Sequence, residues 1–136
     1  MSKSDPDSLS RILLTDSPDE INKKIRLAVT DSESNITYDP DRRPGVSNLL
    51  DILSSFDPDH RSAEELSVDF RYASMKAFKE HVARTLAENL RDIRERYLNL
   101  MMNHDGHLER VAAIGRQKAV DNAERTMQSI RTSMGL

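Results

Sequence analysis

The amino-terminal segment carries side chains that could bind phosphate groups. A lysine stands between two serines in the polar run Met1-Ser2-Lys3-Ser4-Asp5-Pro6. A lysine ammonium is a mobile point charge, and together with hydroxyl or backbone donors it can stabilise negative charge that develops on a phosphate. Ser2, Lys3 and Ser4 are therefore candidate phosphate contacts, and the alternative is an unstructured terminus without a ligand.

A second set of candidates consists of basic residues that could contact a nucleic-acid backbone. Residues 1–70 contain 8 basic and 15 acidic residues, a net charge of −7, whereas residues 71–136 contain 12 and 8, a net charge of +4. Only the C-terminal half could therefore meet a phosphate backbone, and the alternative for this half is a solvated helix surface. The candidates are Lys76, Arg84, Arg91, Arg94, Arg110, Lys118 and Arg125.

Other kinds of site are not predicted. The sequence contains no cysteine, which excludes disulfides and thiolate metal sites. His104 and His107 flank a glycine turn without a third ligand, so we predict a turn there and no metal site. The sequence has neither a P-loop nor a Ser/His/Asp set. No apolar run of about 18 residues is present, so we expect no membrane partner.

The elements that must position these residues are predicted to be helices. Ser17 and Glu20 form a capping box for a helix over 18–29, and Ser62 and Glu65 form a second one. Apolar residues at helical spacing predict a further helix over 46–53, a long uninterrupted helix over 74–102 and a last helix over 107–135. The fold class is therefore all-α, a bundle of about five helices preceded by an exposed loop.

The two C-terminal helices are predicted to pack against each other in antiparallel orientation. One side of the first is apolar and is expected to face the core; its residues are Met75, Phe78, Val82, Leu86, Leu90, Ile93, Tyr97 and Leu100. Small residues on the last helix allow a partner helix to approach closely; these are Ala112, Gly115, Ala119 and Ala123.

Several blocks of sequence occur in an order that is typical of one enzyme family. The main blocks are Met1-Ser2-Lys3-Ser4-Asp5-Pro6-Asp7, Arg11-Ile12-Leu13-Leu14-Thr15-Asp16-Ser17-Pro18, Ile36-Thr37-Tyr38-Asp39-Pro40 and Arg43-Pro44-Gly45-Val46-Ser47-Asn48-Leu49-Leu50. With them the chain resembles the C-terminal part of tryptophanyl-tRNA synthetases of the bacterial and mitochondrial type. Its first four residues match the end of the KMSKS loop of class I synthetases. Asp92 departs from the family pattern, which has proline there, and this predicts a straighter long helix.

The resemblance implies roles for particular residues. Lys3 would be catalytic, and Met1, Ser2, Lys3 and Ser4 would form the ATP-contacting loop. Residues 1–17 would be this loop with a docking segment, and residues 18–136 the helical domain that binds the tRNA anticodon. The implied cofactors are ATP and Mg²⁺, and the implied partners are L-tryptophan, tRNA-Trp and a second subunit in a homodimer.

The resemblance also implies that parts of the enzyme are missing. The catalytic Rossmann domain, with its HIGH-like signature and tryptophan pocket, has no counterpart in this sequence. We therefore expect a fragment or a shortened product of a tryptophan-specific aminoacyl-tRNA ligase, inactive by itself.

Other interpretations of the sequence are also compatible with these features. One is a stand-alone, non-catalytic module for tRNA binding or dimerisation, and another is an unrelated helical interaction protein. A tyrosyl-tRNA synthetase is the nearest enzymatic alternative, although residues 43–50 favour tryptophan. Residues 11–17 favour the mitochondrial matrix as the location, with the bacterial cytoplasm as the alternative.

Overall fold

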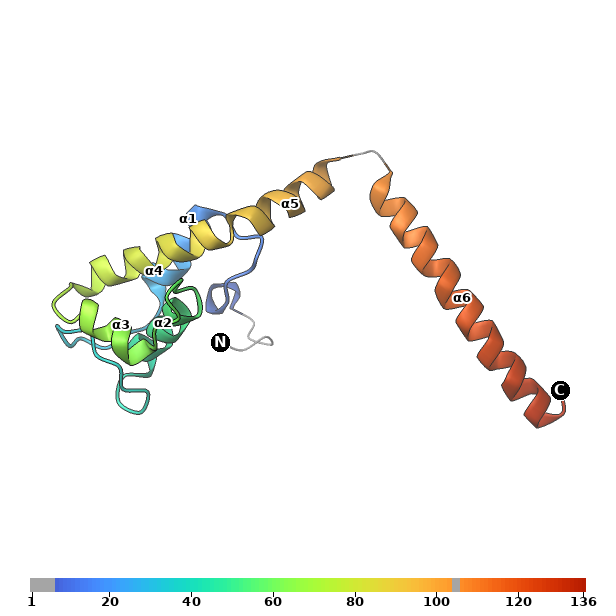
Figure 1. Ribbon diagram of the computed structural model, residues 1–136, viewed down its shortest axis with the longest axis horizontal. Helices are drawn as coiled ribbons and strands as arrows, with labels where there is room; N and C mark the ends of the chain where they lie inside the picture. Colours follow the sequence, from blue (N-terminus) through green and yellow to red (C-terminus); the bar gives the residue numbers. More distant parts are fainter. Residues whose placement is uncertain (1–6, 104–105) are drawn as a thin grey trace. The chain divides into compact units, whose positions relative to one another are not determined.

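The computed structural model describes residues 7–103 and 106–136. Within these residues the chain forms one short 3-10 helix, six α-helices and no strand, so the all-α prediction is confirmed (Figure 1). The elements are η1 (Ser8–Ser10), α1 (Pro18–Leu27), α2 (Pro44–Ser55), α3 (Ala63–Asp69), α4 (Met75–Asn89), α5 (Arg91–Met102) and α6 (His107–Met134). They fall into two compact units, Met1–Glu95 and Arg96–Leu136.

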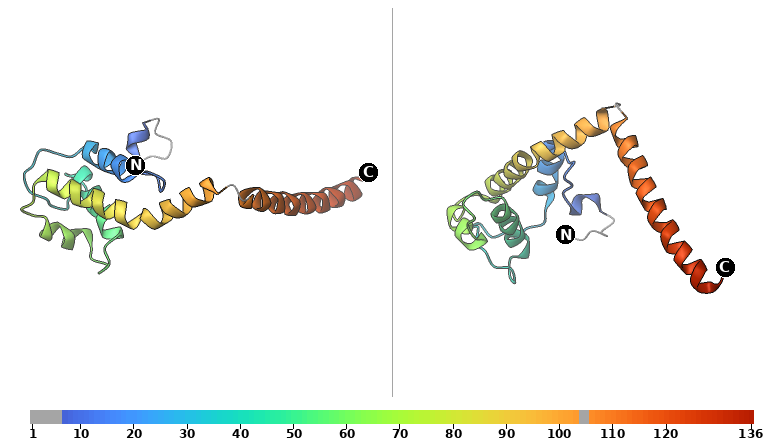
Figure 2. Two further views of the ribbon diagram at one scale, coloured as in Figure 1. Left: turned by 90° about the horizontal axis from the view of Figure 1, so that it is seen from above. Right: turned by 45° about the vertical axis from the view of Figure 1, so that its right-hand side comes forward.

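The hydrophobic core of the first unit is built around α4. Helices α1 and α2 both pack against α4, and α3 packs against α2; the further views in Figure 2 show α1 lying along α4. Burial of apolar surface is the main stabilising term in such a core. The core side chains are Ile21, Ile25, Ile36, Val46, Leu49, Leu50, Leu53, Ala63, Leu66, Phe78, Val82, Ala83, Leu86 and Leu90.

Both predicted capping boxes are confirmed. The Ser17 hydroxyl accepts a hydrogen bond from the Glu20 N–H at 3.3 Å, and the Glu20 carboxylate accepts one from the Ser17 N–H at 2.8 Å. This donation from Ser17 lowers the pKa of Glu20. Ser62 and Glu65 make the same reciprocal pair at the start of α3. Each box satisfies donors that a helix start leaves without an intrahelical partner.

The loop between α1 and α2 is held by a buried arginine and a close backbone approach. The Arg43 guanidinium donates to both carboxylate oxygens of Asp31 at 2.9 and 2.7 Å, to the Asn35 carbonyl at 2.7 Å and to the Thr37 hydroxyl at 2.8 Å. At Gly45, an added Cβ would lie only 2.2 Å from the Val29 carbonyl oxygen. Glycine is therefore required at this position for the loop to pass so close to α2.

The long helix predicted over 74–102 is interrupted, which corrects the sequence analysis. Leu90 lies between α4 and α5 with φ −86° and ψ −5°, a departure from helical ψ. Ile93, Tyr97 and Leu100, predicted to face the core, are 48%, 43% and 47% exposed. The core elements α1 and α2 pack against α4, and the buried core of the first unit ends at Leu90.

The last helix, in the second unit, has the predicted extent. Gly106 and Gly135 flank α6 with φ of 71° and 76°, the left-handed region in which glycine is favoured. Every residue of α6 is exposed, and the antiparallel packing of α6 on the preceding helix stays a prediction. None of the helices in the described part of the chain is long and apolar enough to cross a membrane.

Candidate functional site

A groove between α1 and the α4–α5 segment brings together three of the predicted basic residues. Its volume is about 590 Å³. Arg84, Arg91 and Arg94 are spaced by seven and three residues, which places them on neighbouring positions of one helical side. The lining residues are Pro18, Asp19, Asn22, Glu80, Ala83, Arg84, Ala87, Glu88, Arg91 and Arg94.

The groove carries as many carboxylates as guanidinium groups. Asp19 of α1 and Glu80 and Glu88 of α4 line it beside the three arginines. Lys76, which was predicted to belong to the same basic surface, does not line the groove and lies 3.9 Å from the Glu80 carboxylate. Sequence reasoning missed Asp19 because this residue comes from a different helix. The groove is therefore not a uniformly positive surface.

Of the three arginines, Arg94 also has a structural role. Its Nη1 donates to the backbone carbonyl of Asp16 at 3.3 Å. The buried Asp16 carboxylate in turn accepts from the Leu13 N–H at 2.8 Å and from the Lys24 ammonium at 2.5 Å. Arg84 and Arg91 are exposed, and Arg91 lies 3.5 Å from the Asp92 carboxylate. These two arginines are the ones available to a ligand in the groove.

The Asp16 cluster also anchors the chain that follows the amino-terminal loop. The predicted loop residues Met1, Ser2, Lys3 and Ser4 lie outside the described residues. Beyond them, Asp7 accepts a hydrogen bond from the Leu9 N–H at 2.9 Å and caps η1, which contacts α1. Ile12 packs against the core. The downstream end of the loop is therefore attached to α1 and, through Arg94, to the start of α5. Sequence reasoning gave no signal for this cluster.

The three remaining predicted basic residues lie on α6, in the second unit. Arg110, Lys118 and Arg125 are all exposed. Arg125 Nε donates to the Asp121 carbonyl within the helix at 3.1 Å. A contribution of these residues to nucleic-acid binding stays a prediction.

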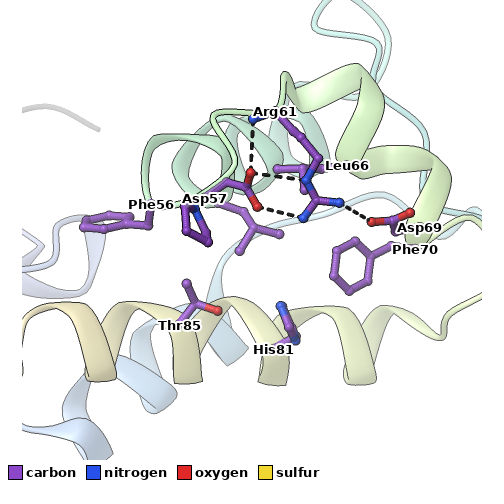
Figure 3. A pocket seen from close by; sticks show the side chains of 10 residues that line it. Phe56, Asp57, Arg61, Leu66, Asp69, Phe70, His81 and Thr85 are labelled. Atoms are coloured by element: carbon purple, nitrogen blue, oxygen red, sulfur yellow. Dashed lines mark hydrogen bonds and ion pairs between the residues drawn. The ribbon is translucent and has the colours of Figure 1, made fainter.

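A second, smaller cavity lies between the α2–α3 connection and α4. It has a volume of about 210 Å³. Figure 3 shows Arg61 between Asp57 and Asp69, with His81 and Thr85 of α4 on the opposite side of the cavity. The Arg61 guanidinium donates to Asp57 at 2.7 Å and to Asp69 at 2.8 Å. The half-buried His81 ring lies 5.0 Å from the Phe70 ring.

The stability of the first unit is expected to depend on pH through two carboxylates, each of which is paired with an arginine. Hydrogen bonds from Arg43 lower the pKa of Asp31 to about 2, and those from Arg61 lower the pKa of Asp57 to about 2, against an ordinary value of 3.8. Because the folded pKa values lie below the unfolded ones, this stabilisation is complete above pH 4 and is lost as the pH falls towards 2. We expect the urea midpoint to fall over this range and to fall less for Asp57→Asn. An equal fall in both proteins would contradict the role of Asp57.

Metal ligands are not gathered in the described part of the chain. No group of three or more His, Cys, Asp or Glu side chains among these residues is placed to hold a metal ion. We therefore assign no residue of this chain to Mg²⁺ and derive no step through it.

Comparison with known proteins gives consistent results. A family model described as tRNA synthetases class I (W and Y) matches residues 1–91. The tryptophan–tRNA ligase of Rickettsia conorii is 38% identical over 135 residues, which are 99% of this chain and 40% of that protein. The corresponding ligase of Bacillus subtilis is 35% identical over 136 residues, 100% of this chain and 40% of that protein.

A mitochondrial relative and a solved structure extend this comparison. The mitochondrial tryptophan–tRNA ligase of Saccharomyces cerevisiae is 39% identical over 137 residues, 99% of this chain and 35% of that protein. The crystal structure of tryptophanyl-tRNA synthetase from Mycoplasma pneumoniae superposes with a TM-score of 0.60 and 26% identity, over 100% of this chain and 42% of that one. The chain thus spans about two fifths of the length of the bacterial curated relatives it matches.

Proposed function

Because the chain belongs to the class I tRNA synthetases of the tryptophan and tyrosine family, we propose that it is the C-terminal part of a tryptophan–tRNA ligase. In this role it supplies the phosphate-contacting loop and the helical tRNA-binding region. The complete ligase activates L-tryptophan with ATP, accompanied by Mg²⁺, and transfers it to tRNA-Trp. The names of the relatives favour tryptophan over tyrosine as the amino acid.

The observation that supports this proposal most strongly is the anchoring of the amino-terminal segment. Asp16 is held by Lys24 of α1 and by Arg94 of α5. We propose that this cluster fixes the base of the loop formed by Met1, Ser2, Lys3 and Ser4, while the loop itself closes over the triphosphate of ATP. Lys3 then stabilises negative charge that develops on the phosphates during activation, which is electrostatic and not covalent catalysis.

The tRNA contacts are proposed for the exposed arginines of the groove. Arg84 and Arg91 lie on the same side as Arg94 and line a groove open to solvent. Backbone contacts of this kind position a nucleic acid without reading its sequence. Additional candidates for tRNA contacts lie on exposed helix surfaces; they are Lys76, Arg110, Lys118 and Arg125. Because the chain spans about two fifths of the length of its bacterial relatives, we propose that the isolated chain is inactive.

A second role, as a non-catalytic module, is favoured by one observation. The buried core is contained in residues 21–90 and includes side chains from α1 to α4, so the first unit has the means to fold by itself. Such a module would bind tRNA or a second subunit and would catalyse no reaction.

For the location of the protein we propose the mitochondrial matrix, with the bacterial cytoplasm as the alternative. Both a mitochondrial and a bacterial ligase are similar to this chain.

Charge reversal in the groove tests the proposed tRNA contacts. The variant carrying both Arg84→Glu and Arg91→Glu is expected to bind tRNA-Trp about tenfold more weakly or worse. The dependence of log Kd on log salt should also become shallower, because each lost phosphate contact removes roughly one ion from the salt slope. Filter binding over a series of KCl concentrations measures both quantities.

A control for this test is Arg71→Glu, which reverses one charge, against two in the groove variant, at an exposed position outside the groove. It should leave the salt slope unchanged. Equal weakening by Arg71→Glu and by the groove variant would show a general charge effect and contradict the groove as the tRNA contact.

A further inference from the structure

The cavity between the α2–α3 connection and α4 has the size and the lining of a site for one small ring. Its apolar part is formed by Leu53, Phe56, Leu66 and Phe70. An apolar cavity of about 150 Å³ holds one benzene molecule, and pockets for drug-sized ligands begin at roughly 300 Å³. The volume of about 210 Å³ lies between these two values. A single six-membered ring with its substituents therefore fits.

Two polar side chains on the α4 side of this cavity, His81 and Thr85, make no hydrogen bond in the described part of the chain. The Thr126 hydroxyl, by contrast, donates to the carbonyl four residues earlier at 3.1 Å. Figure 3 shows both side chains on the side of α4 that faces Arg61 and Phe70. No buried side-chain nitrogen or oxygen among the described residues lacks a partner. The free groups of His81 and Thr85 are therefore accessible to water and to a ligand.

The opposite side of the cavity has further hydrogen-bonding groups on Arg61 and Asp69. A guanidinium has five N–H donors. In Arg61, Nε and Nη2 donate to Asp57 at 3.2 and 2.7 Å, and Nη1 donates to Asp69 at 2.8 Å. Within the described residues this leaves one N–H on each terminal nitrogen, and it leaves Oδ1 of the exposed Asp69 without a donor. Asp57 is saturated, because it also accepts from the backbone N–H groups of Asp59 and Arg61.

The charges around the cavity favour a neutral ligand. Two carboxylates, Asp57 and Asp69, face one guanidinium, and the excess negative charge disfavours a phosphate or a carboxylate in the cavity. A neutral ring must then offer acceptors to the two remaining N–H groups of Arg61 and a donor to Asp69. Cytosine has these groups side by side, because its amino donor stands next to the acceptors N3 and O2. Carboxylates also accept from this amino group in nucleic-acid recognition.

From these observations we propose that the cavity binds one cytosine base. Asp69 accepts a hydrogen bond from its amino group, and Arg61 donates to N3 and O2. The Phe70 ring supplies the aromatic contact that unpaired bases use in proteins, and His81 and Thr85 supply hydrogen bonds from the α4 side. A free nucleoside and single-stranded RNA both present this base. The proposal does not depend on the proposed ligase function, because it concerns only residues that line this cavity.

Titration of the whole isotope-labelled chain with cytidine and with uridine, followed by amide NMR spectra, tests the site. Cytidine should shift the signals of Arg61, Phe70 and His81 in a saturable manner, with a Kd of about 1 mM, the scale for a ligand of this size. Uridine should bind about tenfold more weakly, because it brings a carbonyl oxygen against the Asp69 carboxylate in place of the amino group. Equal Kd values for the two nucleosides would overturn the proposal.

Substitutions in the cavity test the assigned contacts. Asp69→Asn should weaken cytidine binding by about tenfold and remove the preference over uridine, since an amide can donate to the uridine carbonyl. Asp59→Asn is the matched control, because it makes the same change at an exposed residue outside the cavity. It should leave both Kd values unchanged, and equal effects of the two variants would contradict the proposal. His81→Phe keeps a ring beside Phe70 but removes both nitrogens, and it should weaken cytidine binding by about fivefold. Circular dichroism checks that each variant is folded.

A single-stranded RNA of four cytidines distinguishes the two sources of the base. Tighter binding than that of cytidine, with shifts at the same three residues, would assign the site to an RNA strand. Equal or weaker binding would assign it to the free nucleoside, and both results support a cytosine site. Absence of saturable shifts at these residues with cytidine at about 20 mM would overturn the site. That result would not affect the proposed ligase function, which is tested by aminoacylation.

Discussion

Replacing Phe78 with alanine is expected to lower the free energy of unfolding of the first unit by about 4 kcal/mol, the range for a buried phenylalanine. Phe78 lies on the side of α4 that faces the core and is fully buried. Its ring is 5.3 Å from the ring of Phe70, so the substitution removes an aromatic contact and leaves a cavity. Urea denaturation followed by circular dichroism measures the loss.

Tyr72→Ala is the matched control for this prediction. Tyr72 is an aromatic residue of the same unit that is 93% exposed, and exposed substitutions usually change stability by less than about 0.5 kcal/mol. A loss of less than about 1 kcal/mol for Phe78→Ala would contradict the placement of Phe78 in the core.

Replacing Arg43 with methionine is expected to cost about 3 kcal/mol of stability, because removal of one partner of a buried ion pair leaves the other uncompensated. The Arg43 side chain is 4% exposed and that of Asp31 is 28% exposed. Methionine keeps most of the length but none of the donors to Asp31, Asn35 and Thr37. Arg43→Lys should recover only part of the loss, since lysine lacks the planar fork that binds both carboxylate oxygens.

The neighbouring Arg42 provides the control for this position. It is exposed, and its backbone N–H is the group that bonds the Asp39 carboxylate, at 3.0 Å. Arg42→Met should therefore change the free energy of unfolding by no more than about 0.5 kcal/mol. Equal losses in the free energy of unfolding for the Arg42 and Arg43 variants would mean that the positive charge of the segment stabilises the fold, and not the buried hydrogen bonds of Arg43.

Local features of this fold could be predicted from the sequence. The capping boxes at Ser17 and Ser62 were found because all of their partners lie within three residues. The extent of α6 was found for a similar reason, since Gly106 and Gly135 mark its two ends. The family resemblance, carried by blocks of neighbouring residues, was confirmed as well.

Features that join distant segments could not be predicted. Periodicity alone placed Tyr97 on a core-facing side, although Tyr97 is 43% exposed and the buried core of the first unit ends at Leu90. The contact of Arg94 with Asp16 joins residues 78 positions apart, and Asp19 reaches the groove from another helix. Such neighbours become visible only once α1 is packed on α4. The seven basic residues predicted as one class therefore divide into groove residues and residues of separate helix surfaces.

The most direct test of the proposed function is aminoacylation by a hybrid enzyme. In it, this chain replaces the matching two fifths of the Bacillus subtilis tryptophan–tRNA ligase. The hybrid is expected to charge tRNA-Trp with tryptophan. Lys3→Ala in the hybrid should lower kcat for tryptophan activation by about a hundredfold, the scale for losing one charge-stabilising group. Lys23→Ala, on the exposed surface of α1, should leave it unchanged. A folded hybrid that charges no tRNA, or one in which Lys3→Ala has no effect, would contradict the account.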